Sequence, residues 1–170
     1  NVTLVGVLSA DSALNLPDYR ASERTFSLLT QAAGRAGRGD KPGKVIFQAY
    51  DVENKVLEQA ARQDYDSFAT DELKAREMFF YPPFAQMLKM TIWDKDEAAA
   101  LALAKRVTTF LQGQQLEGKL CDLMVLGQFP GLVAKVRDMY RFNILVKAKD
   151  MKAVKEALLA SEFKEQRNLF

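Results

Sequence analysis

The spacing of hydrophobic and polar positions changes along the chain, and its first part follows a strand, helix, strand order. Residues 2–9 form a β-branched and nearly continuous apolar run, which is typical of a strand buried on both faces of a parallel sheet. Over residues 21–33 apolar side chains recur every three or four positions, so this segment is predicted to be a helix. A second apolar run at 45–50 predicts another buried strand, and a short helix is expected over 54–63. This order of elements is typical of an α/β crossover unit.

The pattern differs in the rest of the chain. A helix is predicted over 66–80, and Pro82 and Pro83 end it because neither proline can donate a backbone hydrogen bond. Alternating polarity from Gln86 to Trp93 then predicts a half-exposed antiparallel strand. The elements expected after it are a helix over 96–112, strands over 120–127, 132–136 and 140–149, and a helix over 150–159. Strands joined by short turns and combined with two helices indicate a small α+β sandwich of the split β-α-β kind.

These two patterns divide the chain near residue 64. We expect residues 1–64 to be an α/β unit and residues 65–170 to be an α+β domain. The length of 170 residues fits one domain or two small ones. Hydrophobic residues make up 48% of the chain and charged residues 27%, as is usual for globular proteins, so the chain is able to bury a core.

The residue types that the chain lacks exclude several kinds of site. With no histidine in the sequence, a Ser-His-Asp or Cys-His catalytic site and a histidine-ligated zinc site are excluded. Cys121 is the single cysteine, so an intramolecular disulfide and a thiolate metal cluster are excluded too, and no metal ligands are expected. No run of about 18 uncharged apolar residues occurs, so no membrane partner is expected. Because the sequence begins at Asn1 directly in an apolar run, we expect a fragment of a longer protein.

A glycine- and arginine-rich stretch after the first predicted helix carries the strongest chemical signal. It reads Q-A-A-G-R-A-G-R from Gln31 to Arg38. If helical geometry persists, Arg35 and Arg38 point the same way, because residues three apart share a helix face. Two guanidinium groups that converge on one point suit an anion that gains charge during a reaction, such as a γ-phosphate in transfer. Gly34 and Gly37 let the backbone approach that ligand, and Gln31 can hold a water or a nucleotide oxygen.

A purely structural explanation of the same residues stays open. Arginines near the C-terminus of a helix complement the helix dipole, and a glycine after the last turn is an ordinary cap. The position of Gln31 three residues before Gly34, together with the strand, helix, strand context, favours the functional interpretation.

At these residues the sequence resembles a known family. The pattern Q-x-x-G-R-x-G-R is similar to motif VI of the superfamily-two helicases. Further segments resemble the replication-restart helicases of the primosomal protein N′ family, and they cover 10–24, 29–31, 39–43, 81–84, 127–135 and 140–147. The likeness runs across essentially the whole chain. It departs at Gln128, where the family pattern predicts a proline, and this affects the geometry of that turn.

The resemblance implies an α/β first part that is the end of a RecA-like helicase lobe, followed by a C-terminal DNA-binding domain. In the family, Arg35 and Arg38 would act as arginine fingers on ATP bound between two lobes, and Gln31, Gly34 and Gly37 would contact that nucleotide. ATP with Mg²⁺ is the implied cofactor, and zinc is implied in the intact protein with its ligands upstream of this sequence. No G-x-x-x-x-G-K-[ST] phosphate loop occurs in these residues, so we expect the fragment alone to be unable to hydrolyse ATP.

Positive charge gathers between residues 132 and 149, which include five basic residues and one acid, whereas the whole chain has a net charge of +2. An aromatic residue, Tyr140, lies within this region and offers a stacking surface beside cations that suit phosphate. On alternating strands the basic residues 135, 137, 141 and 147 share one parity, which is also the pattern of a solvated sheet face. The resemblance favours DNA contact, and the expected DNA-binding residues are Lys135, Arg137, Tyr140, Arg141 and Lys147.

The function implied by the resemblance is that of an ATP-dependent 3′-to-5′ DNA helicase that recognises stalled or branched replication forks and starts primosome assembly. The implied partners are branched and single-stranded DNA, single-stranded-DNA-binding protein, other primosome proteins and the replicative helicase loader. The implied location is the bacterial cytoplasm, in association with the nucleoid. The residues alone leave an alternative, which is a non-enzymatic nucleic-acid-binding or scaffold module with an incidental basic loop.

Overall fold

The chain forms two compact units, Asn1–Ala75 and Arg76–Phe170, in a computed structural model that describes residues 2–36 and 42–165. The division falls later than the boundary expected near residue 64. The physical reason is the packing of Phe68, whose ring stacks on that of Phe26 with 4.2 Å between the centroids. This contact holds the helix that begins at Tyr65 against the first unit.

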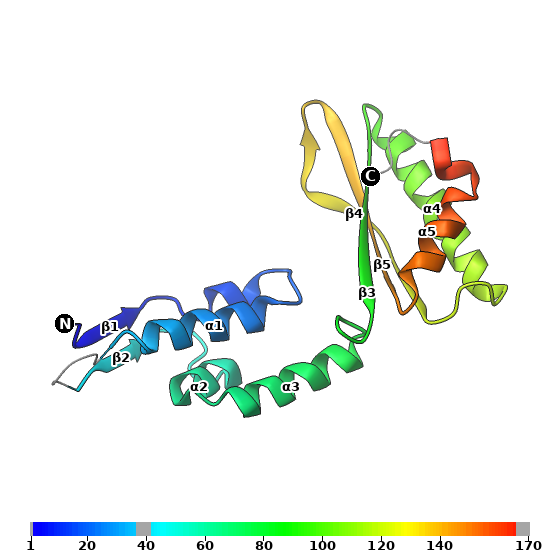
Figure 1. Ribbon diagram of the computed structural model, residues 1–170. Coiled ribbons are helices and arrows are strands. Elements are labelled where there is room, and N and C mark those ends of the chain that lie inside the picture. The colour runs from blue at the N-terminus through cyan, green and yellow to red at the C-terminus, as the bar shows by residue number, and fades with distance from the viewer. Residues whose placement is uncertain (1, 37–41, 166–170) are drawn as a thin grey trace. The chain divides into compact units, whose positions relative to one another are not determined.

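The first unit combines a parallel pair of strands with helices (Figure 1). Its elements in chain order are β1 (Leu4–Val7), a 3-10 helix (Ser12–Asn15), α1 (Ala21–Ala33), β2 (Lys44–Phe47), α2 (Lys55–Arg62) and α3 (Tyr65–Met78). β1 and β2 pair in parallel with Leu4 opposite Lys44, as the strand, helix, strand order predicted. Asn54 starts α2, because its side-chain Oδ1 accepts a hydrogen bond from the Val56 N–H at 3.1 Å.

Neither strand of the first unit is buried on both faces, so that part of the sequence prediction is wrong. Every second residue is exposed, with 59% of Leu4 and 48% of Ile46 accessible to solvent. The half-buried side chains of the opposite face, Val7 and Phe47, pack on the small core around Phe26. The reason is that the described part of the chain supplies a cover for one face of this sheet, whereas parallel sheets are usually covered on both.

The second unit is an α+β domain with helices on one side of an antiparallel sheet (Figure 1). Its strands and helices in chain order are β3 (Gln86–Asp94), α4 (Glu97–Leu116), β4 (Leu123–Val136), β5 (Met139–Ala148), α5 (Met151–Leu159) and a 3-10 helix (Glu162–Glu165). The strand order is β3-β5-β4, with β5 antiparallel to both neighbours. β3 and β4 therefore run parallel on either side of β5, which confirms the split β-α-β arrangement expected from the sequence.

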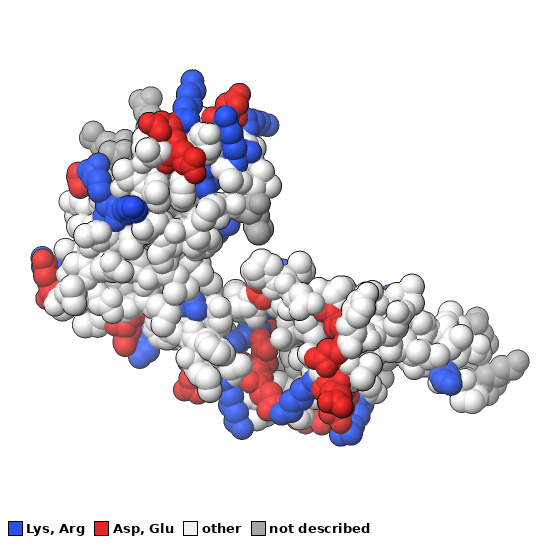
Figure 2. Space-filling view, turned by 180° about the vertical axis from the view of Figure 1, so that it is seen from behind, with Lys and Arg blue, Asp and Glu red and all other residues white. Residues whose placement is uncertain are grey.

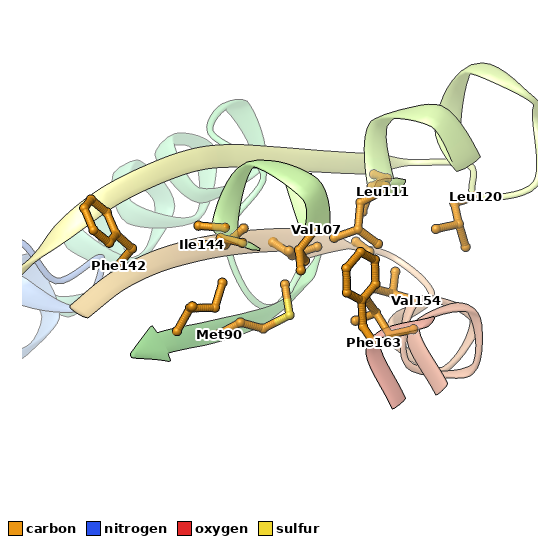
Figure 3. Packing of buried hydrophobic residues seen from close by; sticks show 14 of the residues in the cluster. Met90, Val107, Leu111, Leu120, Phe142, Ile144, Val154 and Phe163 are labelled. Carbon is orange, nitrogen blue, oxygen red and sulfur yellow. The ribbon is translucent and has the colours of Figure 1, made fainter. Parts of the chain in front are cut away.

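A single apolar cluster fills the space between this sheet and its two helices (Figure 3). Val107 and Leu111 on α4 and Ile144 on β5 are fully buried. Val154 on α5 and Phe163 extend the cluster. Burial of each such aliphatic side chain stabilises the fold by about 1.5–3 kcal/mol, so this core holds the sheet and the helices together.

The two short strands expected over 120–127 and 132–136 form one irregular strand, β4. Its pairing with β5 shifts register between Leu126 and Phe129 and again between Pro130 and Lys135. Extra residues in one strand bend it and change which side chains share a face. The first shift places Leu126 and Phe129 on the same face of the sheet, because both pair with odd-numbered residues of β5.

Candidate functional site

The glycine- and arginine-rich stretch lies where α1 ends. α1 closes at Ala33, but turn-type hydrogen bonds continue the winding, from the Arg35 N–H to the Ala32 carbonyl and from the Ala36 N–H to the Ala33 carbonyl, both at 3.2 Å. Arg35 and Arg38 point the same way only if helical winding persists past Gly34. The winding does persist as far as Ala36. Gly37 and Arg38 lie outside the described residues.

Arg35 is exposed and has no carboxylate partner within the described part of the chain. The other arginines of this unit's first helix are used differently. Arg24 and Arg20 both contact Asp18, at 2.7 Å and 3.3 Å, and the Arg20 backbone N–H, followed by its guanidinium, holds the pKa of Asp18 below its ordinary value. As far as the described residues show, Arg35 is thus available to an external anion, whereas Arg20 and Arg24 are paired with Asp18.

The neighbours of Arg35 agree in part with their expected roles. Gln31 is exposed, its Nε2 donates to the Ser27 hydroxyl at 3.1 Å, and its Oε1 accepts no hydrogen bond from residues 2–36 or 42–165. Gly34 has φ −67°, so it is not the left-handed glycine cap of the structural explanation. A Cβ on Gly34 would meet the Thr30 carbonyl at an ordinary 3.4 Å, so packing within the unit does not require glycine there.

Asp11 organises the opposite end of this sheet. It is buried, and its Oδ2 accepts hydrogen bonds from the N–H groups of Tyr50 and Asp51 at 2.9 and 3.1 Å. The Asp51 N–H, with a smaller contribution from that of Tyr50, holds the pKa of Asp11 below its ordinary value despite the opposing effect of burial. Asp11 therefore joins the loop after β1 to the loop after β2.

The basic region of the second unit centres on the β4–β5 hairpin, which lies on the opposite side of the sheet from α4 and α5 in Figure 1. Its two-residue turn is Arg137-Asp138, and both residues have positive φ, 51° and 61°, as a tight type I′ hairpin requires. The Lys135 Nζ lies 5.1 Å from the centroid of the Tyr140 ring and 3.3 Å from Asp138 Oδ1. The structure thus brings Lys135, Arg137 and Tyr140 together at an exposed tip.

The shared parity of the basic residues does not hold across the two-residue turn of the hairpin. Lys135 pairs directly with Tyr140, and opposed residues lie on the same face of a sheet. Arg141 is the next residue along β5, so its side chain lies on the other face. The expectation that Lys135 and Arg141 belong to one sheet face is therefore wrong.

Lys147 is also placed differently from its expected role. Only 3% of it is exposed. Its Nζ donates to the Phe79 carbonyl at 2.8 Å, and burial lowers its pKa. An ammonium enclosed in this way cannot reach a phosphate, so the geometry argues against Lys147 as a DNA contact and assigns it a structural role.

Trp93 is a candidate binding residue that is missing from the DNA-binding residues expected from the sequence. Trp93 is half-buried on β3 and is not among the side chains of the second unit's described core. The alternation from Gln86 to Trp93 already placed it opposite in phase to Ile92, a fully buried residue. That parity was the signal that could have identified it.

The described residues contain no helix that is long and apolar enough to cross a membrane. Residues 2–36 and 42–165 also contain no group of three or more His, Cys, Asp or Glu side chains placed to hold a metal ion. On the face seen in Figure 2, Lys and Arg side chains lie beside Asp and Glu, with uncharged surface between these groups. That face therefore presents mixed charge, with no continuous basic surface.

Comparison with known proteins gives a consistent result. Residues 77–168 match the family described as primosomal protein N C-terminal domain. The chain is 38% identical over 151 residues to the replication restart protein PriA of Bacillus subtilis, which covers 88% of this chain and 18% of that protein. It is 37% identical over 146 residues to PriA of Synechocystis sp., covering 86% and 17%, and 34% identical over 166 residues to PriA of Chlamydia trachomatis, covering 95% and 21%. The chain thus spans about a fifth of the length of these relatives.

Proposed function

The chain belongs to the family of the primosomal protein N C-terminal domain, and on this premise we propose that it is the C-terminal part of an ATP-dependent 3′-to-5′ DNA helicase that restarts replication at stalled or branched forks. The relatives named as replication restart proteins support this proposal, because the likeness extends beyond the family domain into the first unit.

In this proposal the first unit contacts ATP and the second unit contacts DNA. The first unit is the end of a RecA-like lobe, and Arg35 and Arg38 stabilise the charge that develops on the γ-phosphate of ATP, whose Mg²⁺ and phosphate loop come from upstream. Gln31, Gly34 and Gly37 lie along the nucleotide. The exposed faces of Leu4 and Ile46 support this reading, since further parts of a lobe would cover them.

In the second unit, Lys135, Arg137 and Tyr140 at the hairpin tip contact branched or single-stranded DNA, together with Arg141. We include single-stranded-DNA-binding protein, the other primosome proteins and the helicase loader as partners of the intact protein, and zinc as its second cofactor, bound by upstream residues. The proposed place of action is the nucleoid of the bacterial cytoplasm.

The proposal depends above all on Arg35. This arginine is exposed, has no carboxylate partner in the described residues and lies where helical winding continues past the end of α1. Loss of DNA-stimulated ATP turnover in Arg35→Ala and Arg38→Ala variants of the full-length protein tests this half. Binding of the 170-residue chain to forked DNA, weakening steeply as salt rises, tests the other half. If the chain bound DNA while both full-length variants kept their ATP turnover, the alternative of a non-enzymatic nucleic-acid-binding module would replace the proposal.

A further inference from the structure

Within the part of the second unit that the structure describes, helices cover one face of the sheet and leave the other without a helix. Ile92, Ile144 and Val146 point into the core under α4 and α5, and the residues that alternate with them point the other way. We call this second side the open face. Its residues are Met87, Lys89, Thr91 and Trp93 on β3, Arg141, Asn143, Leu145 and Lys147 on β5, and Met124, Leu126 and Phe129 on β4.

The strand register arranges these side chains in rows across the open face. Trp93 lies opposite Arg141. In the next row, Asn143 is flanked by Thr91 on one side and Phe129 on the other, and the Thr91 hydroxyl donates to Asn143 Oδ1 at 2.9 Å. Directly opposed side chains on one face lie about 4.5–5.5 Å apart at Cβ, so the two aromatic residues flank a polar strip.

Exposure varies across this face, because Lys147 and Asn143 on β5 are buried whereas the β4 side chains are exposed. Lys147 is covered by the segment from Phe79 to Tyr81, which its Nζ contacts. On β4, 42% of Phe129 and 38% of Leu126 are exposed. An exposed phenylalanine in the middle of a sheet strand gains little from the fold itself, and a partner with a flat apolar surface would cover it.

The charge of the open face indicates which kind of partner fits. Lys89 and Arg141 supply positive charge, and none of the strand residues of the face named above is an Asp or Glu. A chain of phosphates with stackable bases meets both features, because phosphates pair with cations and bases stack on aromatic rings whatever their sequence. Recognition of single strands by aromatic residues on an exposed sheet face is a known physical solution to this problem.

We propose that the open face binds a single strand of nucleic acid, with Trp93 and Phe129 stacking on bases and Arg141 and Lys89 contacting phosphates. This inference rests on the proposed function, because it names the surface with which the second unit holds DNA and places it on the sheet beside the hairpin tip. It adds Trp93, Phe129 and Lys89 to the DNA-contacting residues.

Trp93 makes the proposal directly measurable, because it is the single tryptophan of the chain. We expect a 20-nucleotide oligo(dT) to quench Trp93 fluorescence saturably, and the quenching to weaken with added salt. Phe129→Ala is expected to weaken oligo(dT) affinity about five- to 150-fold, the effect of losing one base–aromatic stack. Lys89→Ala is expected to lower the salt dependence by roughly one phosphate contact. Leu116→Ala, at a 90% exposed position on α4, is the matched control and leaves affinity unchanged.

The same measurements distinguish failure of the open-face proposal from failure of the proposed function. One outcome would overturn the open-face proposal alone. In it, forked DNA binds and Lys135→Ala and Arg137→Ala weaken the binding, but DNA does not change Trp93 emission and Phe129→Ala does not change affinity. The hairpin contact would then still stand. If Phe129→Ala unfolds the chain, as circular dichroism would show, the unquenched Trp93 of the wild-type chain still overturns the proposal. If neither forked DNA nor oligo(dT) binds at low salt, both proposals fall.

Discussion

The Nζ of Lys147 lies 3.4 Å from the centroid of the Tyr81 ring. The same ammonium donates to the carbonyl of Phe79, directly after the last residue of α3, where helix carbonyls lack partners and the helix dipole favours a cation. The chain turns there with Phe80 at φ 55°, and the Tyr81 N–H donates to the Arg76 carbonyl at 2.7 Å, as in a Schellman motif. Lys147 thus fastens this turn to the sheet of the second unit.

Removal of the Lys147 side chain is expected to destabilise the fold. Lys147→Ala leaves the Phe79 carbonyl without its donor and opens a cavity under Tyr81, so it should lower the free energy of unfolding by about 2–4 kcal/mol. Lys147→Met keeps most of the packing and should cost less, about 1–2 kcal/mol. Urea denaturation followed by far-ultraviolet circular dichroism measures both.

The matched control for this prediction is Lys135→Ala, because the Lys135 side chain is 47% exposed. Exposed lysines usually contribute less than about 0.5 kcal/mol. Equal stability of the Lys147→Ala and Lys135→Ala variants would show that the contact with Tyr81 does not hold the turn.

The stability of the first unit is expected to depend on pH through Asp11. Its pKa is lower in the folded chain than in the unfolded chain, because the N–H groups of Asp51 and Tyr50 stabilise the carboxylate. Its contribution is therefore complete above the ordinary value of about 3.9 and is lost as the pH falls through the lowered pKa. The difference in unfolding free energy between the wild-type chain and Asp11→Asn should be largest near neutral pH and shrink below about pH 4. A difference that stayed constant from pH 7 to pH 3 would exclude this role.

Replacing Asp138 is expected to strengthen DNA binding. Asp138 stands at the hairpin tip, with 93% of its side chain exposed, and pairs with Lys135. Asn tolerates the positive φ of this position, so Asp138→Asn keeps the turn while it removes a negative charge and frees Lys135. We expect a several-fold higher affinity for forked DNA at low salt, which fluorescence anisotropy would detect. A weaker affinity would show that DNA does not approach the tip.

Features set by neighbouring residues were predictable from the sequence. Helices were expected from residues 54, 96 and 150, and Asn54, Asp96 and Asp150 cap these helices with their side chains. The winding after α1 likewise follows from local chemistry, and so the position of Arg35 at a helix end could be predicted. The α+β class of the second unit was predicted from the change between alternating and helical spacing of its apolar residues.

Features set by distant contacts were not predictable in the same way. The face on which Phe129 lies depends on the register shift against β5 between Leu126 and Phe129, and the sequence of β4 alone does not show where that shift falls. The sequence around Lys147 predicts an exposed strand residue. The structure covers it with the turn at Tyr81, which lies 66 positions earlier in the chain. The exposure of Leu4 likewise depends on what covers the other face of β1. In each case the surroundings of the side chain are set by contacts that the sequence around it does not specify.

The matched control for the arginine assignment is Arg62. It lies on α2, has a 71% exposed side chain and pairs with Glu58 at 2.6 Å, so Arg62→Ala should leave ATP turnover unchanged. The affinity for forked DNA should stay the same in the Arg35→Ala and Arg62→Ala variants, because we propose that the second unit supplies that contact.

DNA-stimulated ATP turnover of the Arg35→Ala variant of the full-length protein tests whether the first unit supplies the arginine half of an ATP site. An arginine that stabilises the transferring phosphate contributes a factor on the order of a thousand or more to turnover. We predict a loss of that order with unchanged affinity for forked DNA. Wild-type turnover in the Arg35→Ala variant would contradict it.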